Sequence, residues 1–339
     1  MSKFPIGGRE LASVIEVKEL TKKYGELTAV DHISFSVEHG EIFGLLGPNG
    51  AGKSTTISML CTIIKPTSGT ALVNGFDVCK HPSHVRKTIG IVFQDPSVDD
   101  RLTGRENLRV HANLYGVPAN EQKKQIDEVL NLVELQGRGD DLVRHYSSGM
   151  RRRLEIARSL IHYPKVLFLD EPTVGLDPQS RDRIWSYIKK LMKFEDVTVI
   201  LSTHYLEEAD QFCDRVAIVD RGRIVALDTP HSLKDELGGD TIVVRTRDND
   251  RFYAGAQASG LVKSAVRVDR EIKMTVANAH TVLPRLMDLA AKEGIYVESV
   301  SLQEPSLDEV FLHYTGRQIR ESGDREHYGL EAAMRRQVR

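Results

Sequence analysis

The sequence predicts an α/β fold, in which helices cover a parallel sheet, followed by a small α+β domain. Short apolar runs of strand length alternate with longer stretches whose apolar residues recur at helical spacing. One apolar run ends directly in a glycine-rich loop that opens a helical stretch. The composition shifts near Gly238-Gly239-Asp240. With 339 residues, the chain has room for two domains at roughly 100–200 residues each.

The first domain is expected to begin with strands, after a short flexible leader at residues 1–12. The β-like runs are Val14–Lys18, Leu27–Val30, Ile33–Val37 and Ile42–Leu46. The last of these leads into the glycine loop. The stretch Lys53–Ile64 that follows the loop has helical spacing, which Pro66 is expected to end.

Strands and helices then alternate, which is typical of a parallel sheet covered by helices. Further strands are expected at Thr70–Val73, Gly90–Phe93, Val166–Leu169, Val197–Leu201, Arg215–Val219 and Arg223–Leu227. Helices are expected at Arg105–Tyr115, Glu121–Val133, Gly149–His162 and Pro178–Lys193. The mostly helical segment Leu102–Arg144 indicates an inserted helical subdomain, at about 102–163 of a domain that spans 14–237.

The second domain is expected at 240–315. Its candidate strands are Thr241–Arg245, Lys263–Val268, Glu271–Val276 and Tyr296–Leu302, with a helix at Thr281–Glu293 that Gly294 ends. The tail at 316–339 is rich in Arg and Glu and is expected to be flexible or weakly helical.

Composition excludes several classes of protein. A net charge of −2, from 46 basic and 48 acidic residues, argues against a general nucleic-acid binder. Cys61, Cys79 and Cys213 are scattered and odd in number, which favours reduced thiols in a cytosolic protein over a disulfide framework or a zinc site. No run of 18 apolar residues occurs, and the N-terminus lacks the apolar core of a secretory signal. If the protein serves a membrane, we expect it to dock on another chain.

The glycine loop carries the strongest chemical signal. Its residues, Gly47-Pro48-Asn49-Gly50-Ala51-Gly52-Lys53-Ser54, fit the G-x-x-x-x-G-K-S pattern between a strand and a helix. Glycines allow backbone N–H groups to wrap a phosphate, and the next helix directs its positive end at the same anion. Lys53 adds a full charge near the β- and γ-phosphates, and the Ser54 hydroxyl suits Mg²⁺. A chance glycine-rich turn is the competing explanation, and the strand–loop–helix context disfavours it. The sequence therefore predicts an ATP site with Mg²⁺.

Two carboxylates follow the buried strand Val166–Leu169. Asp170 and Glu171 would emerge at the carboxyl end of that strand, where parallel sheets place their ligands. We expect Asp170 to hold Mg²⁺, directly or through water. Glu171 would lie one position closer to solvent, where it could polarise an attacking water. Alone, such a pair is usually an ordinary solvated loop, but the phosphate loop favours the functional interpretation.

The order and spacing of these motifs resemble the nucleotide-binding subunits of ATP-binding-cassette (ABC) transporters. The resemblance covers about Val14 to Leu227. It implies a RecA-like parallel sheet core with an antiparallel β subdomain and a helical subdomain, followed here by the small α+β domain. It also implies ATP hydrolysis, with Thr55 among the residues that contact the nucleotide.

The resemblance assigns roles to residues that would mean little alone. Tyr24 lies where the family stacks an aromatic ring on adenine, although a surface or core tyrosine is the competing explanation. Gln94 matches the glutamine that reaches Mg²⁺ and the attacking water. Asp177, in Leu176-Asp177, matches the dimer-contacting D-loop. His204 matches the switch histidine that contacts the γ-phosphate.

The family signature, L-S-G-G-Q, corresponds here to Tyr146-Ser147-Ser148-Gly149-Met150. Ser147, Ser148 and Gly149 would face the nucleotide bound to a second copy of the chain. Ser148 departs from the family's first glycine. If the position needs a positive φ, the serine costs on the order of 1 kcal/mol; if φ is negative it costs little. The following Arg151-Arg152-Arg153 run is expected to be a solvated face.

Several stretches resemble one branch, the ATPase subunits of ABC-2-type exporters of the daunorubicin-resistance type. They are Asp99–Leu108, Tyr146 with Met150–Leu154, and the C-terminal Pro305–Leu312. In that branch the membrane permease is usually a separate chain. The branch implies two copies head to tail with two ATPs between them, held on the cytoplasmic side of the membrane by the permease, which would contact residues near Gln94–Arg105.

The transported substrate is not predicted, and drugs, lipids, glycans and natural-product precursors all remain open. A second hypothesis is a non-transport ABC protein, whose ATP binding switches partner contacts without sustained turnover. Glu171 and His204 favour the enzyme, and Ser148 is the one feature that favours weak turnover. No long heptad array and no second cassette occur, which argues against the DNA-repair and translation-factor relatives.

Overall fold

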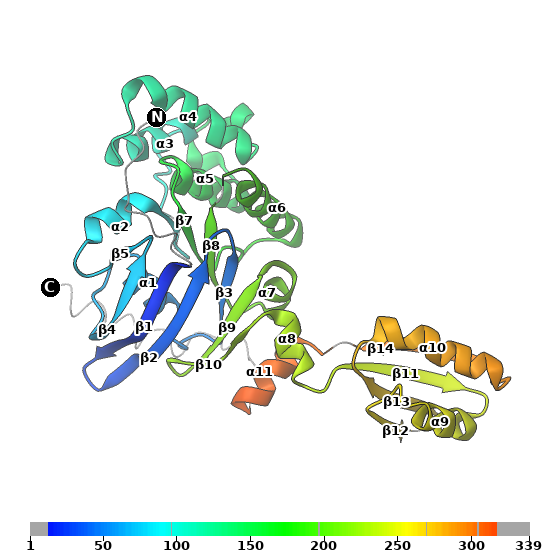
Figure 1. The fold of residues 1–339 in the computed structure, drawn as a ribbon. Helices are drawn as coiled ribbons and strands as arrows, with labels where there is room; N and C mark the ends of the chain where they lie inside the picture. The colour runs from blue at the N-terminus through cyan, green and yellow to red at the C-terminus, as the bar shows by residue number, and fades with distance from the viewer. Residues whose placement is uncertain (1–12, 96, 196, 269, 304, 317–339) are drawn as a thin grey trace. The chain divides into compact units, whose positions relative to one another are not determined.

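The computed structural model describes residues 13–95, 97–195, 197–268, 270–303 and 305–316, so the expected leader and nearly all of the expected tail lie outside them. The described chain forms two compact units, with the boundary between Val225 and Ala226. Together they have the predicted α/β architecture (Figure 1).

The centre of the first unit is a six-stranded sheet in the order β10-β9-β3-β8-β7-β6. The strands are β3 (Ile42–Leu46), β6 (Ile89–Val92), β7 (Val166–Asp170), β8 (Thr198–Thr203), β9 (Arg215–Asp220) and β10 (Arg223–Asp228). The pairs from β9 through β3, β8 and β7 to β6 are parallel. Every residue of β3, β7 and β8 is buried, as expected for parallel strands covered on both faces. The carboxyl ends of these strands therefore share one edge.

Helices and a second sheet surround this core (Figure 1). The helices are α1 (Lys53–Leu60), α2 (Pro82–Thr88), α6 (Pro178–Glu195) and α7 (Leu206–Phe212). The antiparallel sheet has the order β2-β1-β4-β5, with β1 (Ser13–Tyr24), β2 (Leu27–Glu38), β4 (Ser68–Val73) and β5 (Phe76–Asp77). The two strands expected between Leu27 and Val37 are one strand, which stays continuous through an irregularity where His32 has a φ of 49°.

A helical subdomain occupies the segment between β6 and β7. It contains α3 (Gly104–Leu114), α4 (Ala119–Leu132), two 3-10 turns, η1 (Gln136–Arg138) and η2 (Val143–His145), and α5 (Ser148–Leu160). Thr103 and Glu106 form a reciprocal capping box that starts α3. Helix α5 also packs against β6 and α6, so it connects this subdomain to the sheet core.

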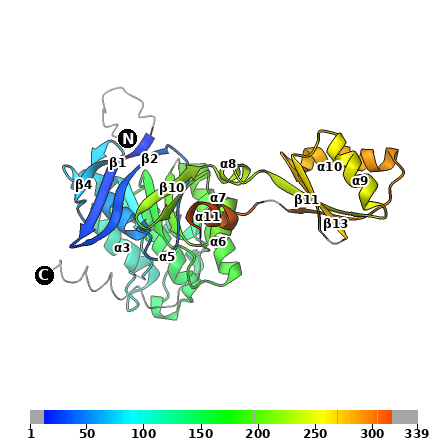
Figure 2. The same ribbon diagram turned by 90° about the horizontal axis from the view of Figure 1, so that it is seen from below.

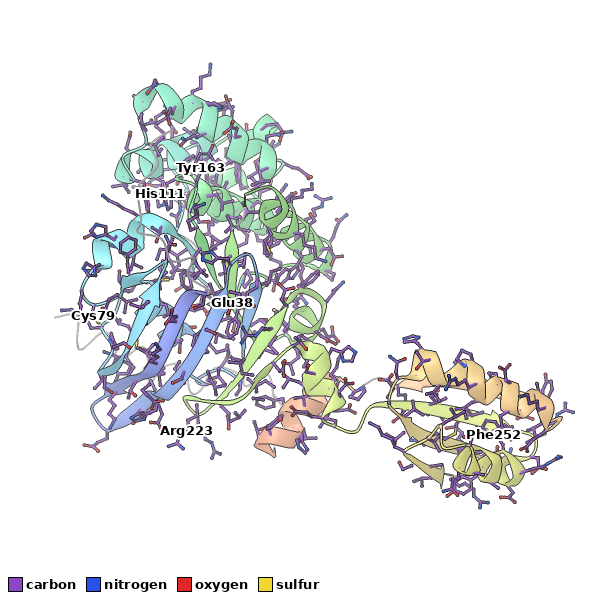
Figure 3. The ribbon with its side chains drawn as sticks, viewed as in Figure 1. Glu38, Cys79, His111, Tyr163, Arg223 and Phe252 are labelled. Carbon is purple, nitrogen blue, oxygen red and sulfur yellow. The ribbon has the colours of Figure 1, made fainter. Side chains whose placement is uncertain are left out.

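The second unit is a four-stranded antiparallel sheet with helices. Its elements are α8 (Pro230–Asp235), β11 (Asp240–Thr246), α9 (Asn249–Ala258), β12 (Ser264–Val268), β13 (Glu271–Val276), α10 (Ala279–Lys292), β14 (Val297–Gln303) and α11 (Leu307–Thr315). The strand order is β12-β13-β11-β14. Helices α9 and α10 cover one face of the sheet (Figure 2). Phe252 of α9 is fully buried in the core that they enclose (Figure 3).

Two further features differ from expectation. Helix α1 ends at Leu60 rather than Ile64, because the chain leaves the helical conformation at Thr62, whose φ is 63°. The helices α2, α7, α8 and α9 were not predicted. Within the described part of the chain, no helix combines the length and the apolar composition needed to cross a bilayer.

Candidate functional site

The loop from Gly47 to Ser54 connects the buried strand β3 to helix α1, and two of its glycines are required by close backbone approaches. Gly47 has a φ of 151°, and a Cβ there would lie 2.2 Å from the carbonyl oxygen of Val219. At Gly52, where φ is 107°, a Cβ would lie 2.5 Å from the carbonyl oxygen of Ala29. Only glycine fits both positions.

The start of α1 presents donors for an anion. Gly52 is the N-cap of α1 and supplies no side-chain cap, so the first amides of the helix are not covered by a side chain of their own cap. The helix dipole adds positive potential at the same point. Ser54 and Thr55 lie in this first turn. The loop and the helix terminus together form a cradle suited to a phosphate.

Lys53 lies inside this cradle and is only 5% exposed. Its Nζ donates to the carbonyl oxygens of Gly47, at 2.7 Å, and Pro48, at 3.1 Å. The same Nζ lies 3.5 Å from Oε1 of Glu171. Burial lowers the pKa of Lys53, while the charge of Glu171 opposes that shift. The ammonium is thus held by groups that a phosphate could replace.

Asp170 is the last residue of β7, and its carboxylate contacts two hydroxyls. Oδ1 accepts from Oγ of Ser202 at 2.5 Å and from Oγ of Ser54 at 3.0 Å. Ser202 is opposite Asp170 in the parallel pair of β7 and β8. Burial raises the pKa of Asp170, and the two hydroxyl hydrogen bonds partly oppose the shift. The carboxylate and the Ser54 hydroxyl are the oxygen ligands that Mg²⁺ prefers.

Glu171 is as deeply buried as Asp170, at 6% against 7% exposed, so the expectation that it would lie closer to solvent is wrong. Its φ is 50°, a left-handed conformation that turns the side chain inward. Oε2 lies 2.6 Å from Nδ1 of His204, a close contact whose geometry does not meet that of a hydrogen bond. Burial alone would raise the pKa of Glu171, but His204 and Lys53 hold it below its ordinary value. The group is therefore a carboxylate at neutral pH.

The structure does not bring every candidate into this cluster. Gln94 is exposed on the loop after β6. The pairing of Val92 with Leu169 places that loop beside the segment after β7. Tyr24, at the end of β1, is 9% exposed, and Nζ of Lys22 lies 4.8 Å from the centre of its ring. An adenine stacked on that face of Tyr24 would have to displace Lys22.

The signature segment forms the start of α5. Ser147 is the N-cap, and its hydroxyl accepts from the amide of Met150 at 3.2 Å. Ser148 is exposed and is the first residue of helix α5. Its φ is not positive, so the serine carries no left-handed strain. Gly149 is buried, and a Cβ there would lie 2.7 Å from Oγ of Ser180. In this chain the close approach requires glycine at Gly149, the second glycine position of the L-S-G-G-Q signature, and not at Ser148, the first.

Asp177 lies directly before helix α6, which packs against the signature helix α5. It is exposed and accepts from the amide of Ser180 at 3.0 Å, in the first turn of α6. The hydrogen bonds from Ser180 lower the pKa of Asp177. Because Oγ of Ser180 lies so near Gly149 that a Cβ would not fit between them, the D-loop and the signature segment are neighbours within one copy of the chain.

Sequence reasoning missed two residues of this region. Ser202 contacts both Asp170 and the amide of Glu171, and the available signal was a polar residue at the end of a buried strand. Arg152, expected on a solvated face, is instead buried at 7% exposure and donates to the backbone after β7. The expectation failed because Arg152 faces β6 and β7, which lie far away in the sequence.

The family model described as "ABC transporter" matches residues 30–174, and one described as "ATP-binding protein DrrA1-3-like, C-terminal domain" matches residues 229–315.

Curated relatives match along most of the chain. The daunorubicin resistance ATP-binding protein DrrA3 of Streptomyces coeruleorubidus is 41% identical over 313 residues, which covers 91% of this chain and 99% of the relative. The linearmycin resistance ATP-binding protein LnrL of Bacillus subtilis is 40% identical over 312 residues, covering 91% of this chain and all of the relative.

Solved structures match about two thirds of the chain. CbiO1 of Clostridium perfringens, part of an ABC transporter complex, has a TM-score of 0.62 at 31% identity and covers 67% of this chain and 92% of its own. A dimeric ATP-binding cassette in a post-hydrolysis state with ADP and phosphate has a TM-score of 0.58 at 27% identity, covering 63% of this chain and 98% of its own.

Proposed function

Because this chain belongs to the ATP-binding subunits of ABC transporters, we propose that it hydrolyses Mg²⁺-bound ATP to power export through a separate membrane subunit. The observation that carries the proposal is the buried pair of Lys53 and Glu171 beside the phosphate loop, with the half-buried His204 in contact with the same carboxylate. A site that only bound nucleotide would not require a buried carboxylate held between two nitrogen groups.

ATP would be bound first by the loop from Gly47 to Ser54. The amides of the loop and of the start of α1 would hold the β- and γ-phosphates, with Thr55 in the same turn. Lys53 would turn from the carbonyl oxygens of Gly47 and Pro48 to the phosphate oxygens. Tyr24 would contribute to the adenine side once Lys22 moves from its ring.

Ser54 and Asp170 are the residues that would hold Mg²⁺, with Gln94 reaching in from the next loop. When bound, the ion neutralises charge that builds up on the transferred phosphoryl group. The hydroxyl and carboxylate oxygens that lie together here fit this role.

Glu171 would act as the general base for hydrolysis. In the described arrangement its carboxylate contacts Lys53 and His204. A γ-phosphate would compete for both nitrogen groups, which releases the carboxylate to accept a proton from the attacking water. Its pKa, held below the ordinary value, keeps the base ionised at neutral pH. His204 would then orient the γ-phosphate.

A second copy of the chain would complete the site. Ser147, Ser148 and Gly149 start a helix whose N-terminus is exposed, as a contact with another copy's nucleotide requires. Asp177 would lie at the same interface. ATP would then favour a closed head-to-tail dimer, because it binds well only between two copies.

The proposed partner is an integral membrane permease in a separate chain, with this subunit on the cytoplasmic side. Relatives named for daunorubicin and linearmycin resistance support the export of a small organic compound, without identifying it for this chain. The non-transport alternative depended on strain at Ser148, and the helical conformation of Ser148 removes that argument.

Copurification tests the partner. The chain would be extracted from membranes of its own host in a mild detergent, with the Glu171→Gln variant used to trap the ATP-bound form. Recovery of a multi-helix membrane protein in stoichiometric amount supports the proposal. If the parent chain and the Glu171→Gln variant are both recovered without a membrane protein, the proposal is contradicted.

A further inference from the structure

Arg152 connects three segments of the candidate site through one buried guanidinium. It lies in the second turn of α5, five residues after the N-cap Ser147, and its side chain is 8% exposed. All three of its nitrogen atoms donate hydrogen bonds. The acceptors are the carbonyl oxygens of Phe93, Asp170, Glu171 and Pro172 and the carboxylate of Glu155, at 2.5–3.1 Å.

The acceptors identify what Arg152 holds in place. Asp170 and Glu171 carry the proposed Mg²⁺ ligand and general base, and the guanidinium contacts the backbone of both. Phe93 directly precedes Gln94, so the start of the loop that bears this glutamine is held as well. One side chain of the signature helix thus fixes the backbone at the ends of β6 and β7.

Glu155, one turn further along α5, completes the arrangement. Its Oε2 accepts from Nη1 of Arg152 at 2.9 Å, and its Oε1 accepts from the amide of Ser97 at 2.8 Å. Phe93 and Ser97 are therefore each held by a residue of the same helix. Glu155 is only 2% exposed, so this pair is shielded from solvent.

The backbone of Glu171 explains why such a contact is needed. Its φ of 50° is unfavourable for a residue with a side chain and persists only where neighbours fix it. Ser202 binds the amide of Glu171, through its carbonyl oxygen at 3.2 Å and its hydroxyl at 3.0 Å. Arg152 binds the carbonyl oxygen of Glu171 at 3.1 Å. The conformation that turns the carboxylate toward Lys53 is thus held from both sides.

We propose that Arg152, with Glu155, is a positioning residue for ATP hydrolysis, which fixes Glu171 and the loop of Gln94 relative to the signature helix. The inference rests on the proposed roles of Glu171 and Gln94. A lysine cannot substitute for Arg152, because its single ammonium group cannot reach all the acceptors that the three nitrogen atoms of the planar guanidinium reach. The phosphate cradle is made by β3 and α1, so ATP affinity should not depend on Arg152.

The test compares Arg152→Lys with Arg153→Lys in the full-length chain. Arg153 is the next residue of α5, but its guanidinium contacts Val133, Glu134 and Tyr187, away from the phosphate loop. Fluorescence of Trp185, the single tryptophan, reports folding of both variants. We expect Arg152→Lys to lower kcat by about tenfold or more, with the Kd for ATP within about threefold, and Arg153→Lys to change kcat by less than about twofold.

Other outcomes overturn the inference. They are an unchanged kcat in Arg152→Lys, an equal loss in Arg153→Lys, or a parallel loss of ATP affinity. If Arg152→Lys fails to fold, Glu155→Gln replaces it, and an unchanged kcat there has the same meaning. Glu171→Gln separates the premise from the inference. Retained turnover in that variant rejects the role of Glu171 and the inference with it, whereas an inactive Glu171→Gln beside an unimpaired Arg152→Lys rejects the inference alone.

Discussion

The carboxylate of Glu171, which is buried, lies 2.6 Å from Nδ1 of the half-buried His204. Its other oxygen lies 3.5 Å from Nζ of Lys53. The candidate base therefore bridges the phosphate loop and the loop after β8. In the proposed mechanism a phosphate would compete for the same two nitrogen groups, which would couple nucleotide binding to release of the base.

Glu171→Gln tests this arrangement directly. The amide keeps the size of the side chain but cannot accept a proton from water, so steady-state hydrolysis should fall by about 100-fold or more. ATP should still bind, with a Kd within about threefold, because the loop and α1 are unchanged. ATP hydrolysis and size-exclusion chromatography with ATP measure both effects, and a stable dimer is expected.

The matched control for this variant is Glu207→Gln. Glu207 is an exposed carboxylate three residues after His204, in the first turn of α7. Its replacement should leave turnover unchanged. Comparable hydrolysis by Glu171→Gln and Glu207→Gln would reject the assignment of the base.

Gly47→Ala should abolish ATP binding. The new methyl group would lie 2.2 Å from the carbonyl oxygen of Val219, and a φ of 151° is unfavourable for alanine. The loop must therefore shift, and the amides that face the phosphate shift with it. Titration with a fluorescent ATP analogue, beside a thermal melt, measures the effect.

Gly137→Ala is the control for Gly47→Ala. Gly137 lies in η1, where a Cβ would meet nothing within 4 Å and φ is not positive. This variant should bind ATP as the parent does. An equal loss of affinity in both variants would mean that the loop geometry described here is not the cause.

How far the sequence predicts this site depends on how local each contact is. The loop from Gly47 to Ser54 was predictable because its strand, turn and helix are consecutive, and so was the placement of Asp170 at the edge of a parallel sheet. Arg152 was not, because its partners come from β6 and β7 and charged residues are rarely buried. The inward turn of Glu171 depends on Ser202, 31 residues away in the sequence.

In the fold, too, the elements set by local sequence were predicted and those set by distant contacts were not. Strand β3 was predicted with its observed bounds, because a short apolar run before a glycine loop is a local pattern. Helix α9 was missed, since its small residues, including Gly255, give weak periodicity, and its core residue Phe252 finds its partners in the sheet. Helix α1 ends early at a left-handed Thr62, which propensity does not predict.

Ser148→Gly, which restores the glycine of the family signature, should not raise activity. Ser148 is the first residue of α5 and already helical, so glycine relieves no strain and costs the helix up to about 1 kcal/mol. We expect kcat within about twofold of the parent. Ser147→Ala provides the contrast, because it removes the cap on the amide of Met150 and should cost about 1 kcal/mol of stability. A clear gain of turnover in Ser148→Gly would show that the serine restrains the enzyme.

Acidification should destabilise the first unit through His111. This residue lies on α3 in the helical subdomain (Figure 3). Burial, with the nearby charges of Arg158 and His162, lowers the pKa of His111 to about 4. The unfolded chain, with a histidine pKa of about 6.5, binds a proton that the folded protein does not bind until about pH 4. Stability should therefore fall as the pH decreases between these two values, and should not change above the higher one.

His111→Gln should reduce that acid sensitivity, because glutamine takes up no proton in either state. One proton bound only by the unfolded chain gives a slope of up to about 1.4 kcal/mol per pH unit, and the partial exposure of His111 reduces the expected recovery to the order of 1 kcal/mol. The measurement is the drop in thermal midpoint between about pH 7.5 and about pH 5, which should be smaller in His111→Gln than in the parent by a few degrees. His39→Gln, at an exposed histidine of the same unit, should leave the drop unchanged. If His111→Gln and His39→Gln lose stability as steeply as the parent, buried groups other than His111 determine the acid response.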